Sequence, residues 1–301
     1  MALPAGVYRR TIETARGHFA ALETHDDGRD GGRAPAVLLP GYTGSKEDFL
    51  ALLAPLGRAG HRAVAIDLRG QYESTGSDEP GRYELSALAA DVLAVIDTTG
   101  RAAHLVGHSF GGFVARTATV MAAALAAQGE GTQGKDPHGD GTHSSQVRTL
   151  TLLSSGPGRV TGAATLANLT LLASALPVHD METIWGVKRA MELDRGEPVQ
   201  PVDIEDFLHS RFVRTHPASL TQAAEQLTAP DDRTAELAGL DTPTLVLYGS
   251  GEDVWAPADL HAMADRLGAA EFVVRGAGHS PAVDDPDATA AALVAFWSTV
   301  H

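Results

Sequence analysis

The chain contains no cysteine, and this absence excludes several kinds of chemistry. Without thiols there is no disulfide, no thiolate nucleophile and no cysteine-ligated zinc or iron–sulfur site. Basic residues are also scarce: 23 lysines and arginines stand against 38 aspartates and glutamates, a net charge of −15. Binding to nucleic acid or to an anionic membrane surface needs clustered lysine and arginine, so neither is expected as a partner.

Long hydrophobic runs are missing as well. No apolar run approaches the roughly 18 residues of a membrane-spanning helix, and the N-terminus lacks the apolar core of a signal peptide. We therefore expect a cytoplasmic protein. What the chain does have is length, with 301 residues of which 44% are hydrophobic and 20% charged. This composition is typical of a folded protein with a sizeable core.

Short apolar runs alternate with segments of helical periodicity. Two strands around Gly17 predict a hairpin over residues 7–13 and 17–24. Further strands are expected at 36–39, 62–67, 102–107, 147–155, 244–249 and 271–276, and helices at 46–59, 84–98, 110–127, 256–267 and 285–299. Strands that are apolar throughout suit a parallel sheet covered on both faces. The pattern therefore predicts the α/β class, with a mostly parallel central sheet and helices on both faces.

Two segments interrupt this alternation. Residues 128–146 are almost free of apolar side chains and predict a flexible surface loop. Three of its residues, His138, Asp140 and His143, are potential metal ligands, but the glycine-rich sequence opposes a preorganised site, and we expect no metal. Residues 156–243 have helical but no strand character, so they form a helical insertion. The core then comprises residues 1–155 and 244–301.

A nucleophile motif follows the strand at 102–107. Gly107-His108-Ser109-Phe110-Gly111 is a G-x-S-x-G sequence between a buried strand and a helix. A serine on such a sharp turn takes strained backbone angles, so small residues are needed two positions before and after it. The turn exposes the hydroxyl near a helix N-terminus, where N–H groups stabilise developing negative charge.

With this motif in this setting, the chain resembles the α/β-hydrolase superfamily from about residue 7 to residue 299. The resemblance implies a catalytic serine, acid and histidine in that order. His279, which follows the last strand, matches the catalytic histidine. Asp253, after the strand at 244–249, lies at the position of the acid, with Glu252 a less favoured neighbour. The strand before it is followed by no carboxylate until Asp180.

The resemblance also implies two oxyanion donors, the backbone N–H groups of Phe110 and Tyr42. Tyr42 lies in a Pro40-Gly41-Tyr42 loop that carries proline where the family usually has histidine. His108 resembles a packing histidine. The segment Asp67-Leu68-Arg69-Gly70-Gln71-Tyr72-Glu73-Ser74 resembles another loop of the family, in which Asp67 and Arg69 are expected to form an ion pair or to anchor the loop.

The insertion at 156–243 falls where this superfamily inserts a helical cap. A cap over the carboxyl ends of the strands excludes water and contributes specificity. The candidates for the wall of a substrate pocket are Tyr42, Leu169, Leu172, Met181, Trp185 and Met191. The cap residues among them have an alternative role, which is to pack the cap onto the core.

These residues together imply a serine hydrolase of the esterase or lactonase type. It would cleave a carboxylic ester or lactone of a small uncharged or weakly polar substrate through an acyl-enzyme, without a cofactor. The same triad also serves C–C bond hydrolysis, cofactor-free perhydrolysis and cyclase or lyase steps in secondary metabolism. A non-catalytic ligand-binding protein is a third possibility. Epoxide hydrolases and haloalkane dehalogenases of this superfamily have aspartate in place of the serine.

Overall fold

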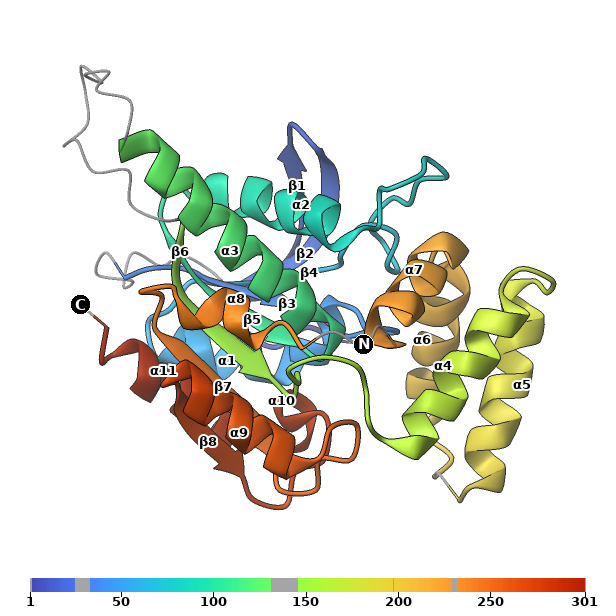
Figure 1. The fold of residues 1–301 in the computed structure, drawn as a ribbon. Coiled ribbons are helices and arrows are strands. Elements are labelled where there is room, and N and C mark those ends of the chain that lie inside the picture. Colours follow the sequence, from blue (N-terminus) through green and yellow to red (C-terminus); the bar gives the residue numbers. More distant parts are fainter. Residues whose placement is uncertain (1, 25–32, 131–145, 197, 229–231, 301) are drawn as a thin grey trace.

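A computed structural model describes residues 2–24, 33–130, 146–196, 198–228 and 232–300. Its centre is an eight-stranded sheet in the order β1-β2-β4-β3-β5-β6-β7-β8 (Figure 1). The strands are β1 (Val7–Thr14), β2 (Gly17–Thr24), β3 (Ala36–Leu39), β4 (Ala63–Ile66), β5 (Ala103–His108), β6 (Val147–Leu153), β7 (Thr244–Gly249) and β8 (Ala270–Val274).

The sheet is antiparallel at one edge and parallel elsewhere. The hairpin pairs Val7 with Thr24 and Thr14 with Gly17, and β2 also runs antiparallel to β4. Every pair from β4 through β3, β5, β6 and β7 to β8 is parallel. The carboxyl ends of the parallel strands therefore meet at one edge, where loops from distant parts of the chain come together.

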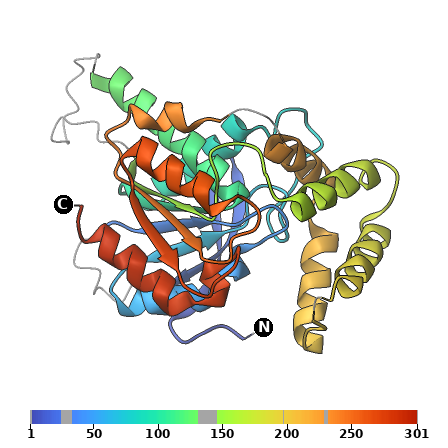
Figure 2. The same ribbon diagram turned by 60° about the horizontal axis from the view of Figure 1, so that its bottom comes forward.

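Helices cover both faces of the sheet, as Figure 2 shows. They are the 3-10 helix η1 (Lys46–Phe49), α1 (Leu50–Arg58), α2 (Leu85–Asp97), α3 (Phe110–Glu130), α8 (Thr234–Ala238), α9 (Pro257–Leu267), α10 (Pro281–Asp284) and α11 (Pro286–Trp297). One apolar core packs α2, α3, α8 and α9 against the sheet, and a second packs α1 and α11 against its other face. Alternate residues of β3 pack into the two cores: Val37 and Leu39 belong to the first core, and Leu38 belongs to the second.

The expectation that no apolar run approaches the length of a membrane-spanning helix is wrong for the longest helix, α3. Within the described residues, Phe110–Gln128 is the one helical stretch long and apolar enough to cross a membrane, and 61% of its most apolar window is buried inside the protein. The helix packs on β5, β6 and α2. A core helix covered by neighbours has the same apolar composition as a membrane span.

Four helices between β6 and β7 form an insert beside the sheet (Figure 1). They are α4 (Ala163–Ala175), α5 (Met181–Asp194), α6 (Val202–Arg214) and α7 (Pro217–Thr228). The insert has a small apolar core of its own, made by Leu172, Leu176, Ile184, Phe212 and Leu220. The side chains on these facing helices are buried mainly by each other.

The predicted fold class is confirmed, and the predicted strands and helices each correspond to an observed element. The main difference concerns residues 128–146. Helix α3 continues to Glu130, and strand β6 begins at Val147. The potential ligands His138, Asp140 and His143 lie outside the described residues.

Candidate active site

The serine of the G-x-S-x-G motif stands on a strained turn between β5 and α3. Ser109 has a φ of 52°, in the left-handed region that residues other than glycine rarely adopt. A Cβ on Gly107 would collide with the backbone of Gly111, and one on Gly111 would lie 2.5 Å from the carbonyl oxygen of Leu39. Only glycine therefore fits at both positions. The backbone N–H of Ser109 donates to the carbonyl of Leu153, 2.9 Å away, which fixes the turn to β6.

The histidine expected to serve as the base lies in the loop between β8 and α10. Its ring Nδ1 is 2.8 Å from Oε1 and 3.1 Å from Oε2 of Glu252. The loop is held on its other side by His108, whose Nε2 donates to the His279 carbonyl oxygen at 2.8 Å. His279 and Ser109 both line one cavity at the carboxyl end of the sheet.

The carboxylate of Glu252 is buried and heavily hydrogen-bonded. Besides His279, its Oε1 accepts the backbone N–H of Val254 at 2.9 Å and of Trp255 at 3.4 Å. Burial alone would raise the pKa of this carboxyl, but the hydrogen bond and the charge of His279, together with the backbone donor, outweigh it and lower the pKa. Glu252 is therefore ionised at neutral pH and orients the imidazole.

The prediction that Asp253 orients His279 is wrong. The Asp253 side chain is exposed, whereas that of Glu252 is buried beneath the histidine. Within the described residues, the His279 ring is hydrogen-bonded to the carboxylate of Glu252 and not to that of Asp253. Asp180 has a different task, because its side chain accepts the N–H of Thr183 and caps α5. Nothing in the Glu252-Asp253 dipeptide indicates which residue faces inward.

The second histidine near the serine is a packing residue, as expected. His108 is buried, and burial lowers its pKa to about 4. A neutral imidazole donates from Nε2 to the His279 backbone, and its Nδ1 lies 3.2 Å from the position that a Cβ on Gly41 would occupy. His108 thus holds the base loop against the loop after β3.

Tyr42, whose backbone N–H is expected to be the second oxyanion donor, lies in the loop after β3. Within the described residues, no acceptor is bonded to the Tyr42 backbone N–H, and Gly41 lies so close that its Cβ would come within 3.2 Å of the Ser109 Cβ. Phe110 is the first residue of α3, where the helix offers its N–H no acceptor. Gln71 supports this arrangement: its side-chain amide donates to the Gly41 carbonyl at 2.8 Å. No pattern in the sequence assigns this supporting role to Gln71.

The cavity next to Ser109 has a volume of about 310 Å³. Two of the predicted wall residues, Tyr42 and Leu169, line it. Three predictions are wrong, because Leu172 and Met181 pack in the core of the insert and Met191 is 38% exposed. Trp185 packs against the same core and lines a neighbouring cavity instead. Leu172, Met181 and Trp185 fill the space between the insert helices because the apolar faces of α4 to α7 turn toward each other.

Several polar residues that no sequence pattern singled out also line this cavity. They are Thr43 and Asp48 near η1, Thr165 and Arg211 from the insert, and Ser280 beside the histidine. Their positions depend on tertiary contacts between the insert and the loop after β3. No local pattern in the sequence brings them together.

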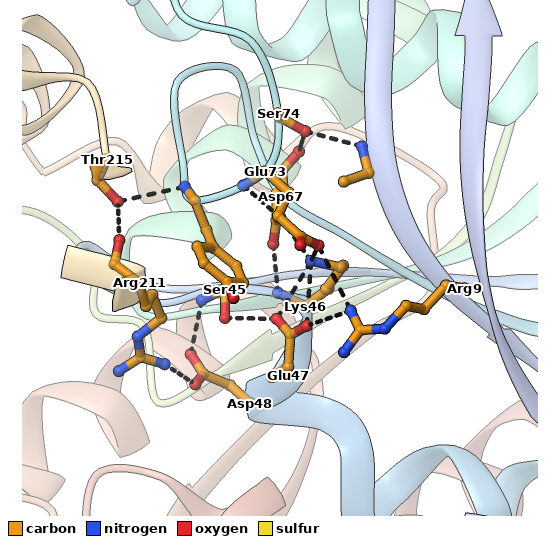
Figure 3. A network of polar contacts seen from close by, with 12 residues as sticks. Arg9, Ser45, Lys46, Glu47, Asp48, Asp67, Glu73, Ser74, Arg211 and Thr215 are labelled. Carbon is orange, nitrogen blue, oxygen red and sulfur yellow. Dashed lines mark hydrogen bonds and ion pairs between the residues drawn. The ribbon is translucent and has the colours of Figure 1, made fainter. Parts of the chain in front are cut away.

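The loop after β4 is anchored by a buried ion-pair network (Figure 3). Lys46 Nζ lies 2.9 Å from Asp67 Oδ2 and 2.7 Å from Glu73 Oε2. Burial raises the pKa of Asp67 to about 6, against the opposing effect of Lys46. Arg69 does not pair with Asp67, because its Nε donates to Asp91 at 2.7 Å. Both residues therefore have the structural role expected, but with separate partners.

The comparisons with known proteins agree with this geometry. Residues 36–292 match the Alpha/beta hydrolase family. A putative carbamate hydrolase, RutD, of Variovorax paradoxus is 41% identical over 81 residues, 26% of this chain and 30% of that protein. The matches to curated relatives cover only 23% to 31% of those proteins' own length.

Two solved structures share the fold over their whole length. A thermophilic esterase from Thermogutta terrifontis has a TM-score of 0.70 and 21% identity, covering 98% of this chain and 99% of that one. The enol-lactonase from Burkholderia xenovorans has a TM-score of 0.68 and 20% identity, covering 96% and 100%. With a matching family profile over most of its length, this chain belongs to the α/β-hydrolase family.

Proposed function

We propose that this protein is a serine hydrolase that cleaves carboxylic esters or lactones of small uncharged or weakly polar substrates. The observation that carries the proposal is the buried, ionised Glu252 bonded to His279, with the strained Ser109 lining the same cavity. An imidazole held in this way keeps its proton on Nδ1 and leaves Nε2 free to accept one. The likeness to an esterase and a lactonase supports the same reaction class.

In the proposed reaction, Ser109 Oγ attacks the carbonyl carbon while His279 Nε2 takes the hydroxyl proton. The N–H groups of Tyr42 and Phe110 donate to the oxygen that becomes negative in the tetrahedral intermediate. Glu252 stabilises the imidazolium. The C–O bond then breaks, and His279 returns the proton to the departing alcohol oxygen. Water, activated by the same imidazole, attacks the acyl-enzyme and releases the acid and Ser109.

The proposal is tested by labelling with a fluorophosphonate probe and by ester turnover. The wild-type protein should be labelled at Ser109, located by mass spectrometry of the digested protein, and should hydrolyse short-chain esters or lactones. Ser109→Ala should lose both labelling and orders of magnitude of turnover while retaining its circular dichroism spectrum and melting temperature. A folded wild-type protein that is neither labelled nor active would refute the proposal.

A further inference from the structure

One cation from the insert reaches into the candidate cavity. Arg211, near the end of α6, lines the same cavity as Ser109, and its Nη1 donates to Asp48 Oδ1 at 2.5 Å (Figure 3). Within the described residues, neither Nε nor Nη2 of Arg211 has an acceptor. A guanidinium has five N–H donors in a fixed plane, so Arg211 has further N–H groups that can donate to a ligand.

The position of this guanidinium is fixed from two sides. Asp48 Oδ2 accepts the backbone N–H of Ser45 at 3.2 Å as part of the capping box of η1, so the carboxylate is held in place. The ring of Phe207 lies 5.3 Å from Arg211 Cζ. Preorganised donors of this kind recognise a ligand with little further loss of side-chain entropy.

A second cavity adjoins the first at this residue. It has a volume of about 210 Å³ and shares Thr43 and Arg211 with the first as lining residues. Its other cations already have partners: Lys188 contacts Glu192, and Arg189 contacts Glu205. Together with Asp48, these carboxylates balance the three cations that line the second cavity.

We propose that Arg211 is a specificity-determining residue that donates a hydrogen bond to a neutral oxygen acceptor of the substrate. The acceptor, a carbonyl or ether oxygen, lies on the part of the substrate that extends from the scissile carbonyl toward the second cavity. The inference rests on the proposed ester hydrolysis and specifies its substrate class. A carboxylate is disfavoured at this place because Asp48 already neutralises the guanidinium and would repel a second anion.

The test uses two series of esters of equal length, with the chain varied on the acyl or on the alcohol side. Each series includes an all-methylene chain, chains with one keto or ether oxygen at successive positions, and a chain ending in carboxylate. The wild-type enzyme should prefer one oxygen position in one series by about tenfold or more in kcat/KM, as expected for a hydrogen bond from a charged donor. Arg211→Gln should abolish this ratio.

Arg214→Gln is the matched control. It makes the same change on the same helix at an exposed residue that lines neither cavity, so the ratio should persist. The inference is overturned if no oxygen position is preferred, if Arg211→Gln keeps the preference, or if the wild type prefers the carboxylate chain. An enzyme that cleaves no ester and is not labelled at Ser109 overturns the proposed function itself, and the inference with it.

A second variant tests the neutralising role of Asp48. Asp48→Asn retains an oxygen acceptor for the Ser45 N–H but leaves the Arg211 charge uncompensated. The carboxylate-ended ester should then gain about tenfold in kcat/KM relative to its all-methylene counterpart. An unchanged ratio in this variant would show that Asp48 does not set the charge preference, and would overturn the assignment of a neutral acceptor.

Discussion

Replacement of Glu252 by glutamine should inactivate the enzyme without unfolding it. The amide oxygen at the Oε1 position can still accept the backbone N–H groups of Val254 and Trp255, which places the NH₂ group at the Oε2 position, 3.1 Å from His279 Nδ1. A second donor so close to Nδ1–H weakens the Nδ1–H···Oε1 hydrogen bond and favours the tautomer with the proton on Nε2, which cannot take a proton from Ser109. The variant also loses the attraction between a carboxylate and an imidazolium about 3 Å apart, about 5 kcal/mol at an effective dielectric constant of about 20.

Such a loss corresponds to a fall of about 10³- to 10⁴-fold in kcat. Steady-state hydrolysis of an activated ester at neutral pH measures it, with the melting temperature as a control for folding. Asp253→Asn is the matched control, because its exposed side chain does not face the histidine, and it should retain kcat within about twofold. The reasoning is refuted if Glu252→Gln stays active, or if Asp253→Asn shows the large loss instead.

Three further predictions concern packing, titration and the cavity wall. Gly111→Ala should lower the free energy of unfolding by about 2 kcal/mol or more, because the new Cβ would lie 2.5 Å from the Leu39 carbonyl oxygen. Burial lowers the pKa of His104 to about 3, so the unfolded chain binds more protons below about pH 6.5, and the free energy of unfolding should fall on acidification. The contribution of His104 is about 1.4 kcal/mol per pH unit between about pH 6 and pH 4. Leu169→Trp should narrow the cavity and reduce kcat/KM for long-chain esters more than for short ones.

Urea denaturation measures the first two effects, and steady-state kinetics the third. A Gly111→Ala variant as stable as the wild type would contradict the close approach at the elbow. His104→Gln removes one titrating group and should reduce the slope of the pH dependence, whereas an unchanged slope would assign it to other residues such as His108. Met191→Trp serves as the control for Leu169→Trp because Met191 lies outside the cavity. Equal effects of the two tryptophans on chain-length preference would remove Leu169 from the wall.

Much of the fold could be predicted from the sequence because its signals are local. Residues 36–39 and 244–249 are examples: these strands are buried on both faces, and a run of consecutive apolar residues indicates such burial directly. The G-x-S-x-G motif is local as a sequence signal, since the collision that demands Gly107 arises within one turn, although the one that demands Gly111 involves Leu39 of β3. His279 was identified by its place after the last strand.

The choice between Glu252 and Asp253 was decided only by the tertiary structure. Both carboxylates follow β7, and their directions depend on how the turn packs against Trp255 and the loop that carries His279. The cavity wall depends on tertiary contacts for the same reason. An apolar side chain such as that of Leu172 is removed from water equally well in the core of the insert or above the serine. The sequence by itself determined which elements form and which groups supply the nucleophile and base. The packing of loops and insert helices, set by contacts between residues far apart in the chain, determined which carboxylate and which side chains face them.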